Sequence, residues 1–548
     1  MPGIDDRYVD DLCERGKDHA VADCGKIAFL RSYFFGRRSP AFGTESRDQK
    51  GWSIMSMIKA EHLTFSYPGS FDTIFEDVSF TIDTDWKLGF VGRNGRGKTT
   101  FLNLLMKKYE YSGTIVSSVP FDYFPYSVAD PGRRTEEILR EVCPNAEEWE
   151  LLRELSYLEV SDDVLWRAFE TLSGGEQTKV LLAALFLNEG RFLLIDEPTN
   201  HLDTRAREIT AAYLRRKKGF ILVSHDRRFL DGCVDHILSL NRADIQLESG
   251  NFSSWMENFS RQQESELAQN MRLKKDIGRL KQSARRTSQW SDQVEATKAG
   301  AYDKGFIGHK AAKMMKRAKS IEARQQKSME EKSKLLKNLE TAEPLKMVPL
   351  PYHSDTLASF SDVSVCYGGK AVHPEISFTV RSGERIALEG KNGSGKSSLL
   401  KLFLPMPPEH TGTVSAGSGI VISYVPQDAS YLRGSLSDFA EERGISKTLF
   451  WAVLRKLDFG RRQLEKDMSE FSGGQKKKVL IAASLCEPAH LYLWDEPLNY
   501  IDLYSRMQVE ALLLEFSPTM VFVEHDAAFR DAVATARIDT DGAGVKQS

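Results

Sequence analysis

The stretch "GRNGRGKT" at residues 92–99 decides the fold. It fits the phosphate-binding pattern GxxxxGK[ST], follows the apolar run "KLGFV" and precedes the helix-like "FLNLLMKK". Glycines in such a loop let backbone N–H groups approach phosphates, and the N-terminus of the following helix favours their charge. The sequence therefore predicts a strand–loop–helix unit that binds a nucleoside triphosphate, with Lys98 at the outer phosphates and Thr99 on Mg²⁺.

A second copy of the loop, "GKNGSGKS", lies at residues 390–397. It stands between the strand-like "RIALE" and the helix-like "SLLKLFL", with Lys396 and Ser397 in the places of Lys98 and Thr99. One match in this context could still be a glycine-rich turn with a chance lysine. Two matches exclude that reading.

Four further motifs recur in the same order at nearly the same spacing. They are "LSGGEQ" and "FSGGQ", "LLIDEPTNHLD" and "YLWDEPLNYID", "VSHD" and "VEHD", and a tyrosine ahead of each loop. The aligned residues are Ser173 and Ser472, Glu197 and Glu496, His225 and His525, and Tyr67 and Tyr367. Five paired motifs predict a tandem duplication of one α/β ATPase module.

The motif set resembles the ATP-binding cassette family. The resemblance implies two cassettes that pack head to tail, so that each ATP lies between one P-loop and the signature of the other cassette. The first site would join Lys98, Asp196, Glu197 and His225 to Ser472, Gly473 and Gly474. The second site would join Lys396, Asp495, Glu496 and His525 to Ser173, Gly174 and Gly175.

The residue types fit phosphoryl transfer, which needs positioning and charge neutralisation more than covalent chemistry. Each aspartate ends an apolar strand and is expected to hold the Mg²⁺ shell, while each following glutamate polarises the attacking water. Each histidine is expected at the γ-phosphate or that water. Further nucleotide contacts are predicted at Gly92, Asn94, Gly95, Gly97, Thr100, Gly390, Asn392, Gly393, Gly395 and Ser398. Tyr67 and Tyr367 would stack on adenine, the alternative being two core tyrosines.

The two cassettes differ at one predicted metal ligand. The second reads "SYVPQD", with Gln427 where the family places an amide that contacts Mg²⁺ and water. The first reads "DYFPYS", with Tyr126 in that position. A phenol replaces the amide, so we expect the first site to hydrolyse ATP more slowly than the second.

Composition indicates a soluble chain of several domains. The 548 residues are 41% hydrophobic and 28% charged with a net charge of -3. Six cysteines lack metal-site spacing, which favours a reduced, cytoplasmic compartment. No apolar run approaches the ~18 residues of a membrane helix. Residues 1–54 are expected to be an N-terminal extension, flexible or upstream of the true start, followed by cassettes at 55–251 and 348–548.

Residues 252–347 form the predicted linker. Two stretches rich in helix formers predict helices of roughly 30 residues, folded as an antiparallel hairpin with glycines near the tip. Residues 281–320 carry ten Lys/Arg against three acids, with aromatics interleaved. This pattern fits nucleic-acid binding, although a solvated spacer would have similar composition. The linker residues predicted to make such contacts are Arg285, Arg286, Trp290, Tyr302, Lys304, Phe306 and Lys310.

Tandem cassettes with a charged helical linker resemble the ABC-F family, which acts on the translating ribosome. The resemblance implies a monomer that binds the E site of the 70S ribosome in the ATP state, with the linker tip near 23S rRNA and P-site tRNA. The spacings from Lys98 to Ser173 and from Lys396 to Ser472 leave no room for the extra arm of many housekeeping members.

Three stretches resemble the Lsa-type antibiotic-resistance group in particular: "WKLGFVGRNGRGKTT", "KGFIGHKAAKMMKRAKS" and "LYLWDEPLNYID". That group is associated with resistance to lincosamides, pleuromutilins and streptogramin A. Three rival functions stay open: a housekeeping translation factor, a DNA-associated ATPase, and a transporter ATPase that recruits separate membrane partners.

Overall fold

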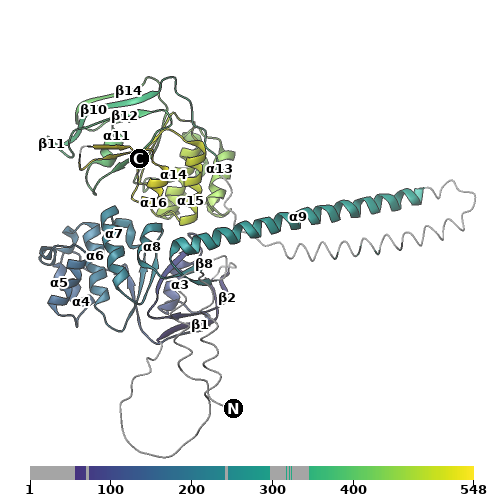
Figure 1. The fold of residues 1–548 in the computed structure, drawn as a ribbon, viewed down its shortest axis with the longest axis horizontal. Helices are drawn as coiled ribbons and strands as arrows, with labels where there is room; N and C mark the ends of the chain where they lie inside the picture. Colours follow the sequence, from purple (N-terminus) through teal and green to yellow (C-terminus); the bar gives the residue numbers. More distant parts are fainter. Residues whose placement is uncertain are drawn as a thin grey trace, which may run out of the picture. The chain divides into compact units, whose positions relative to one another are not determined.

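The structure is a computed structural model that describes residues 56–68, 73–240, 245–296, 345–542 and 544–547, with four single helical positions at 316, 320, 323 and 327. Figure 1 shows two α/β cassettes and the long helix α9 that follows the first of them. The predicted fold class, two tandem α/β ATPase domains, is confirmed.

The first cassette contains two sheets. A three-stranded antiparallel sheet has the order β2-β1-β4, and a six-stranded sheet has the order β5-β6-β7-β3-β8-β9. The strands are β1 (Met57–Ser66), β2 (Thr73–Asp83), β3 (Lys87–Gly92), β4 (Ser112–Ser117), β5 (Phe121–Phe124), β6 (Phe192–Asp196), β7 (Phe220–Val223), β8 (His236–Leu240) and β9 (Ile245–Ser249). The helices are α3 (Lys98–Leu105), α4 (Thr135–Val142), α5 (Glu148–Tyr157), α6 (Gly174–Phe186), α7 (Thr204–Arg216) and α8 (Arg227–Cys233).

The second cassette repeats this topology. Its mainly parallel sheet has the order β15-β16-β17-β13-β18-β19, which is the order of the first cassette strand for strand. The strands are β10 (Thr356–Tyr367), β11 (Lys370–Ala371), β12 (Ile376–Arg381), β13 (Arg385–Glu389), β14 (His410–Ala416), β15 (Ile422–Val425), β16 (Leu491–Asp495), β17 (Met520–Val523), β18 (Ala536–Asp539) and β19 (Gly544–Gln547). The helices are α11 (Lys396–Lys401), α12 (Leu436–Glu442), α13 (Lys447–Lys456), α14 (Gly473–Cys486), α15 (Leu503–Phe516) and α16 (Ala527–Val533).

The central strands place the motifs at one edge of each sheet. Strand β6 is buried along "FLLI" and ends at Asp196, as is expected of a parallel strand covered on both faces. Strand β3 pairs in parallel with β7 on one side and β8 on the other. The P-loop leaves the carboxyl end of β3, so the loop, Asp196 and the residues after β7 meet at the same edge.

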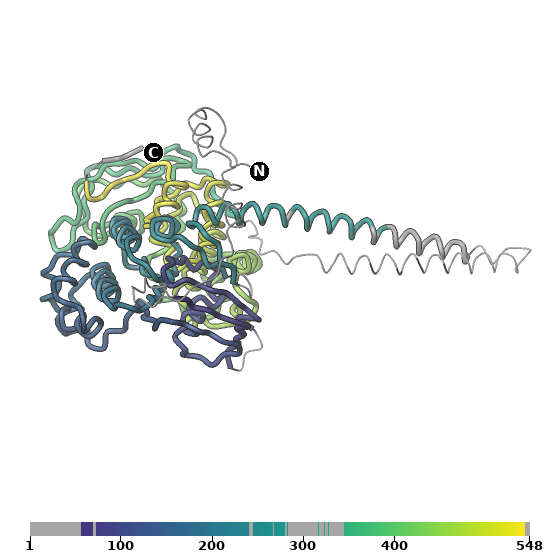
Figure 2. The backbone as a smooth tube through the Cα atoms, turned by 60° about the horizontal axis from the view of Figure 1, so that its bottom comes forward, coloured from purple at the N-terminus to yellow at the C-terminus, as the bar shows by residue number. Residues whose placement is uncertain are grey.

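Helix α9 (Phe252–Ala296) has 45 residues and is longer than predicted. At 1.5 Å per residue it is about 67 Å long, against about 45 Å for the predicted 30 residues. The predicted helix of roughly 30 residues is too short to include "TSQWSDQVEA" at residues 287–296, which continue the helix. In Figure 2 the helix runs away from the cassettes.

Most of the predicted hairpin lies outside the described residues. Tyr302, Lys304, Phe306 and Lys310 are not described, and the second limb is described only at its four helical positions. Arg285, Arg286 and Trp290 lie on the described backbone of α9, but their side chains are not described. The hairpin and its tip therefore stay predictions, and so does the account of residues 1–54.

The two cassettes contact each other directly. Leu503 of the second cassette is buried in the main core of the first. Arg227 forms an ion pair with Glu510, and Arg530 donates a 2.9 Å hydrogen bond to the hydroxyl of Thr204. Among the described residues, no helix is both long enough and apolar enough to cross a membrane.

Candidate active site

The first P-loop is shaped by two glycines. Gly95 and Gly97 have φ angles of 79° and 103°, which residues with a Cβ rarely adopt. A Cβ on Gly97 would also lie 2.5 Å from Ile74. The loop wraps around Lys98, whose Nζ donates to the carbonyl of Gly92 at 2.7 Å and to Asn94 Oδ1 at 3.2 Å.

The second P-loop has the same construction. Gly393 and Gly395 have φ angles of 83° and 84°. Lys396 Nζ donates to the carbonyls of Gly390 at 2.9 Å and Lys391 at 2.6 Å. Both lysines are buried, and burial lowers the pKa of each. The hydrogen bonds described for these ammonium groups go to neutral oxygens of the loop, and a triphosphate would add negatively charged oxygens at the same distance.

Each P-loop hydroxyl contacts the aspartate that ends the neighbouring strand. Thr99 donates to Asp196 at 2.8 Å, and Ser397 donates to Asp495 at 2.9 Å. Mg²⁺ prefers hard oxygen ligands and takes only one or two from the protein, with phosphates and water completing its octahedron. A hydroxyl and a carboxylate side by side fit that ion, and the described residues hold no cluster of three or more His, Cys, Asp or Glu for another metal.

The predicted water-orienting glutamates lie beside the predicted histidines. His225 Nε2 is 3.2 Å from Glu197, and His525 Nε2 is 3.3 Å from Glu496. Both glutamates have positive φ angles, 51° and 47°, which turn the chain sharply after the strand. Strained backbone of this kind gathers at functional sites because the surrounding structure holds it in place.

The two glutamates differ in their surroundings. Burial disfavours the charge of Glu496, but hydrogen bonds from His525, Gln427 and Asn499 outweigh it and lower the pKa to about 2. Burial raises the pKa of Glu197 to about 7, and the attraction of Lys98 only partly offsets that effect. The structure thus places Gln427 on the carboxylate of Glu496, and Asn499 donates to the same carboxylate at 2.6 Å.

The first cassette has a different arrangement where Gln427 would be. Tyr126 is 37% exposed at the surface. Tyr123, three positions earlier, instead donates its hydroxyl to Asp196 at 3.1 Å. Neither Tyr123 nor Asn499 was among the predicted site residues, although both stand inside the quoted motifs and Asn499 recurs as Asn200 in the paired motif.

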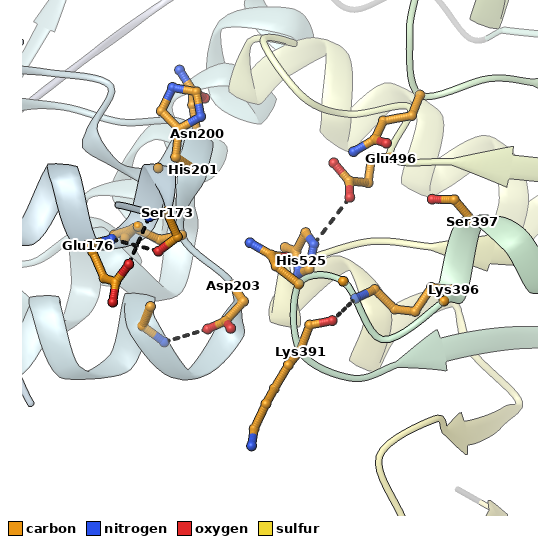
Figure 3. A pocket seen from close by; sticks show the side chains of 18 of the residues that line it. Ser173, Glu176, Asn200, His201, Asp203, Lys391, Lys396, Ser397, Glu496 and His525 are labelled. Atoms are coloured by element: carbon orange, nitrogen blue, oxygen red, sulfur yellow. Dashed lines mark hydrogen bonds and ion pairs between the residues drawn. The ribbon is translucent and has the colours of Figure 1, made fainter. Parts of the chain in front are cut away.

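The second site is composite. A cavity of about 1110 Å³ brings the signature residues Ser173, Gly174 and Gly175 together with Lys396 and His525. Figure 3 shows Ser173 and His201 on the first cassette across from Lys396 and His525 on the second. Ser173 caps α6 with a capping box that satisfies the N–H groups of Ser173 and Glu176, and the dipole of that helix favours negative charge at this end.

The same cavity includes residues that were not among the predicted site residues. Asn200, His201 and Asp203 follow the DEP motif of the first cassette and line the second site. The turn of residues 159–161 also contributes. These positions enter the second site only because the cassettes meet, so the quoted motif of the first cassette contains Asn200, His201 and Asp203 but does not reveal their place in the other cassette's site.

The first P-loop is in direct contact with the second cassette. Asn94 Nδ2 donates to the carbonyl of Tyr500 at 2.8 Å, and Arg93 lies 3.8 Å from Asp458. Tyr500 directly precedes the second cassette's Ile501–Asp502 and packs against the signature at Gly474. The predicted partners Ser472, Gly473 and Gly474 begin α14 as Ser173, Gly174 and Gly175 begin α6.

The two predicted adenine-stacking tyrosines are exposed. Tyr67 is 38% exposed and Tyr367 is 56% exposed, which does not match the alternative of core tyrosines. Their hydroxyls contact the residue after each P-loop, Tyr67 to Thr100 at 2.7 Å and Tyr367 to Ser398 at 2.9 Å. Tyr367 lines the composite cavity.

Comparisons with known proteins agree with this architecture. The family model described as "ABC transporter" matches residues 75–200 and 374–499. The chain is 27% identical over 505 residues to the ribosome protection protein VmlR of Bacillus subtilis (strain 168), covering 88% of this chain and 86% of that protein. It is 26% identical over 527 residues to the energy-dependent translational throttle protein EttA of Escherichia coli (strain K12), covering 86% and 90%.

A solved structure has the same fold. The archaeal ribosome recycling factor aABCE1, crystallised with the ribosomal stalk protein aP1, superposes with a TM-score of 0.59 at 20% identity, covering 87% of each chain. The duplicated family match and the paired P-loops thus lead to one conclusion: the chain is an ATPase with two tandem ABC-type cassettes, and its similarity to VmlR and EttA supports assignment to the ABC-F type.

Proposed function

We propose that this ATPase binds the ribosome in its ATP-bound state and protects the peptidyl-transferase centre from antibiotics. The observation that carries the proposal is the composite cavity, where the signature of one cassette faces the P-loop of the other. ATP filling that cavity would draw the cassettes together. The linker helix α9 starts between them, so closure would set its direction.

The side chains have distinct parts in the proposed cycle. Lys396 binds the outer phosphates, and Ser397 with Asp495 holds Mg²⁺, which when bound supplies charge neutralisation to the phosphates. Glu496 accepts a hydrogen bond from the attacking water, and His525 keeps that carboxylate in place. Loss of the γ-phosphate removes the charge that joins the cassettes, and the protein leaves the ribosome.

The proposed binding position is the E site of the 70S ribosome. From there the linker tip would reach 23S rRNA and P-site tRNA through the basic and aromatic residues of 281–310, and bound drug would leave. The drug classes proposed are lincosamides, pleuromutilins and streptogramin A, on the resemblance to the Lsa-type group. Ribosomes lie in the cytoplasm, which is the proposed location of this monomer. The similarity to VmlR, named a ribosome protection protein, supports this function.

The test is co-sedimentation with 70S ribosomes from a drug-free bacterial lysate. The variant Glu197→Gln, Glu496→Gln lacks both water-orienting carboxylates and should be trapped with ATP bound. We expect it to pellet with ribosomes in ATP and to stay in the supernatant in ADP. An ATP-bound variant that stays in the supernatant would remove the ribosome as partner and bring DNA-stimulated ATPase activity forward as the next assay.

A housekeeping role in translation is the second candidate. It is favoured by the similarity to EttA, named a translational throttle protein, which is nearly as high as that to VmlR. Deleting the gene separates the two. A protection protein leaves drug-free growth unchanged and lowers the inhibitory concentration of the three drug classes, whereas a throttle changes growth without drug.

A further inference from the structure

The first turns of α9 are fixed on the first cassette. The side chain of Asn251 caps the helix by accepting from the backbone N–H of Ser254 at 3.0 Å. The N–H of Ser253 donates to Asp231 on α8 at 2.7 Å. Phe252 and Trp255 are buried in the core of that cassette. The base of the linker helix therefore moves with α8.

One turn further on, Phe259 reaches the second cassette. Its ring stacks on Trp255 with centroids 5.1 Å apart and lies edge-on to Tyr504 with centroids 5.8 Å apart. Tyr504 is the second residue of α15 in the second cassette. Aromatic pairs at these separations attract each other beyond the area that they bury. Phe259 is thus a contact between the linker and α15.

Tyr504 also lies against the P-loop of the first cassette. The guanidinium carbon of Arg93 is 5.5 Å from the centroid of the Tyr504 ring, which is within reach of a cation–π interaction. The carbonyl of Arg93 accepts a hydrogen bond from Lys98 Nζ at 3.2 Å. The lysine predicted to bind phosphate therefore touches the residue that holds the Tyr504 ring.

The second site has different residues at the two key positions. Lys391 stands where the first cassette has Arg93, and Arg205 stands where the second cassette has Tyr504. Two cations replace a cation and a ring, so no cation–π contact forms between them. Arg205 instead pairs with Glu159 of its own cassette at 2.9 Å. Arg205 is therefore the counterpart of Tyr504 in the other cassette and lacks the aromatic contact, so it can serve as a control position.

We propose that Tyr504 is a positioning residue that links the first ATP site to the linker helix through Arg93 and Phe259. Phosphates in the first P-loop draw Lys98 away from the carbonyl of Arg93, and the loop then settles in a second arrangement. The ring of Tyr504 follows the guanidinium, and Phe259 moves with the ring. The direction of α9 therefore depends on whether ATP is bound at the first site, even if that site hydrolyses ATP slowly.

The test is amide hydrogen exchange on the purified full chain in the Glu197→Gln, Glu496→Gln background, with and without ATP. No ribosome is present, so the outcome is separate from that of the proposed function. We expect ATP to change exchange at the start of α9, residues 255–261, by roughly threefold or more. Tyr504→Leu should abolish that change, Tyr504→Phe should keep it, and Arg205→Leu should keep it.

Binding of a fluorescent ATP analogue is measured for each variant. This control shows that a missing exchange response does not result from failure to bind nucleotide. If Tyr504→Leu does not fold, Phe259→Leu tests the same contact from the linker side and should also abolish the change. The proposal is overturned if the leucine variants keep the full ATP-dependent change, or if ATP leaves exchange at residues 255–261 of the parent unaltered.

Discussion

Asn499 donates a 2.6 Å hydrogen bond to Glu496 and so holds the carboxylate that would orient water at the second ATP site. Gln427 and His525 contact the same group. In the first cassette the residue in place of Gln427 is the exposed Tyr126. The duplicated sites therefore differ in how firmly their glutamates are held, and catalysis depends on such positioning.

The first prediction concerns the two glutamates. Glu496→Gln should lower ATP turnover by about 100-fold, whereas Glu197→Gln should lower it by about threefold or less, because most turnover arises at the better organised site. Steady-state phosphate release from the purified protein measures both. Equal losses in the two single variants would contradict the asymmetry.

The second prediction restores the missing amide. Tyr126→Gln, made in the Glu496→Gln background, should raise the residual turnover of the first site by about threefold, because an amide regains the contact that Gln427 makes in the other cassette. Tyr157→Gln is the control, since Tyr157 is also an exposed tyrosine of the first cassette. A gain in both variants would show that the effect is not specific to this position.

The third prediction compares two signature glycines. A Cβ on Gly474 would lie 2.5 Å from the carbonyl oxygen of Tyr500, whereas a Cβ on Gly175 would lie 3.4 Å from that of His201. Gly474→Ala should therefore cost about 1–3 kcal/mol of unfolding free energy and Gly175→Ala less than about 1 kcal/mol. Denaturant unfolding measures both values. A larger loss for Gly175→Ala than for Gly474→Ala would mean that the backbone at Tyr500 moves aside at little cost in free energy.

The fourth prediction concerns a buried ion pair. Lys478 Nζ is 2.7 Å from Asp502, and both side chains are almost fully buried. Burial disfavours the charge of Asp502, but Lys478 outweighs it and holds the pKa of that carboxyl well below its usual range. Lys478→Met should cost about 3–5 kcal/mol because it leaves a buried charge unpaired.

The same pair has a pH signature. The pKa of an aspartate in the unfolded chain is about 4, and in the folded protein the pKa of Asp502 lies below that value. The ion pair therefore stabilises the fold fully above about pH 4, and this stability is lost as the pH falls toward the pKa of the folded state. Lys478→Met should therefore lose less stability than the parent between about pH 5 and pH 3. Lys218→Met is the control, because its partner Asp85 is exposed, and it should change stability by less than about 0.5 kcal/mol.

The fifth prediction tests the linker tip. Deleting residues 289–308 should abolish drug protection in cells while ATP turnover of the purified protein changes by less than about twofold, because the tip is far along the chain from both P-loops. Inhibitory concentrations for the three drug classes provide the measurement. Full protection by the shortened protein would show that the tip has no part in it.

The sequence predicted the parts of the fold that depend on local pattern. Paired motifs gave the duplication, and apolar runs ending in Asp196 and Asp495 placed the carboxylates beside the P-loop hydroxyls. The length of α9 was underestimated because the mostly polar residues 287–296 have no apolar periodicity to mark them and include Thr, Ser and Asp, which favour helices weakly.

Other contacts could not be predicted because they join distant parts of the chain. Tyr123 meets Asp196 across neighbouring strands, and Arg93 meets Tyr504 only where the cassettes touch. Such contacts depend on how two folded units fit together. The motifs gave no role to Tyr123 or Tyr504, and spacing within one cassette does not show which residues of the other cassette Tyr504 contacts.

The burial of Leu503 in the core of the first cassette has a consequence for biosynthesis. Tyr504 and Met507 pack against the same cluster, which also contains Trp255. The first cassette leaves the ribosome long before these residues are translated, so it emerges with an apolar surface still uncovered. The nascent chain therefore completes its first core only when its second half arrives, and a message truncated after the linker yields a product prone to aggregation.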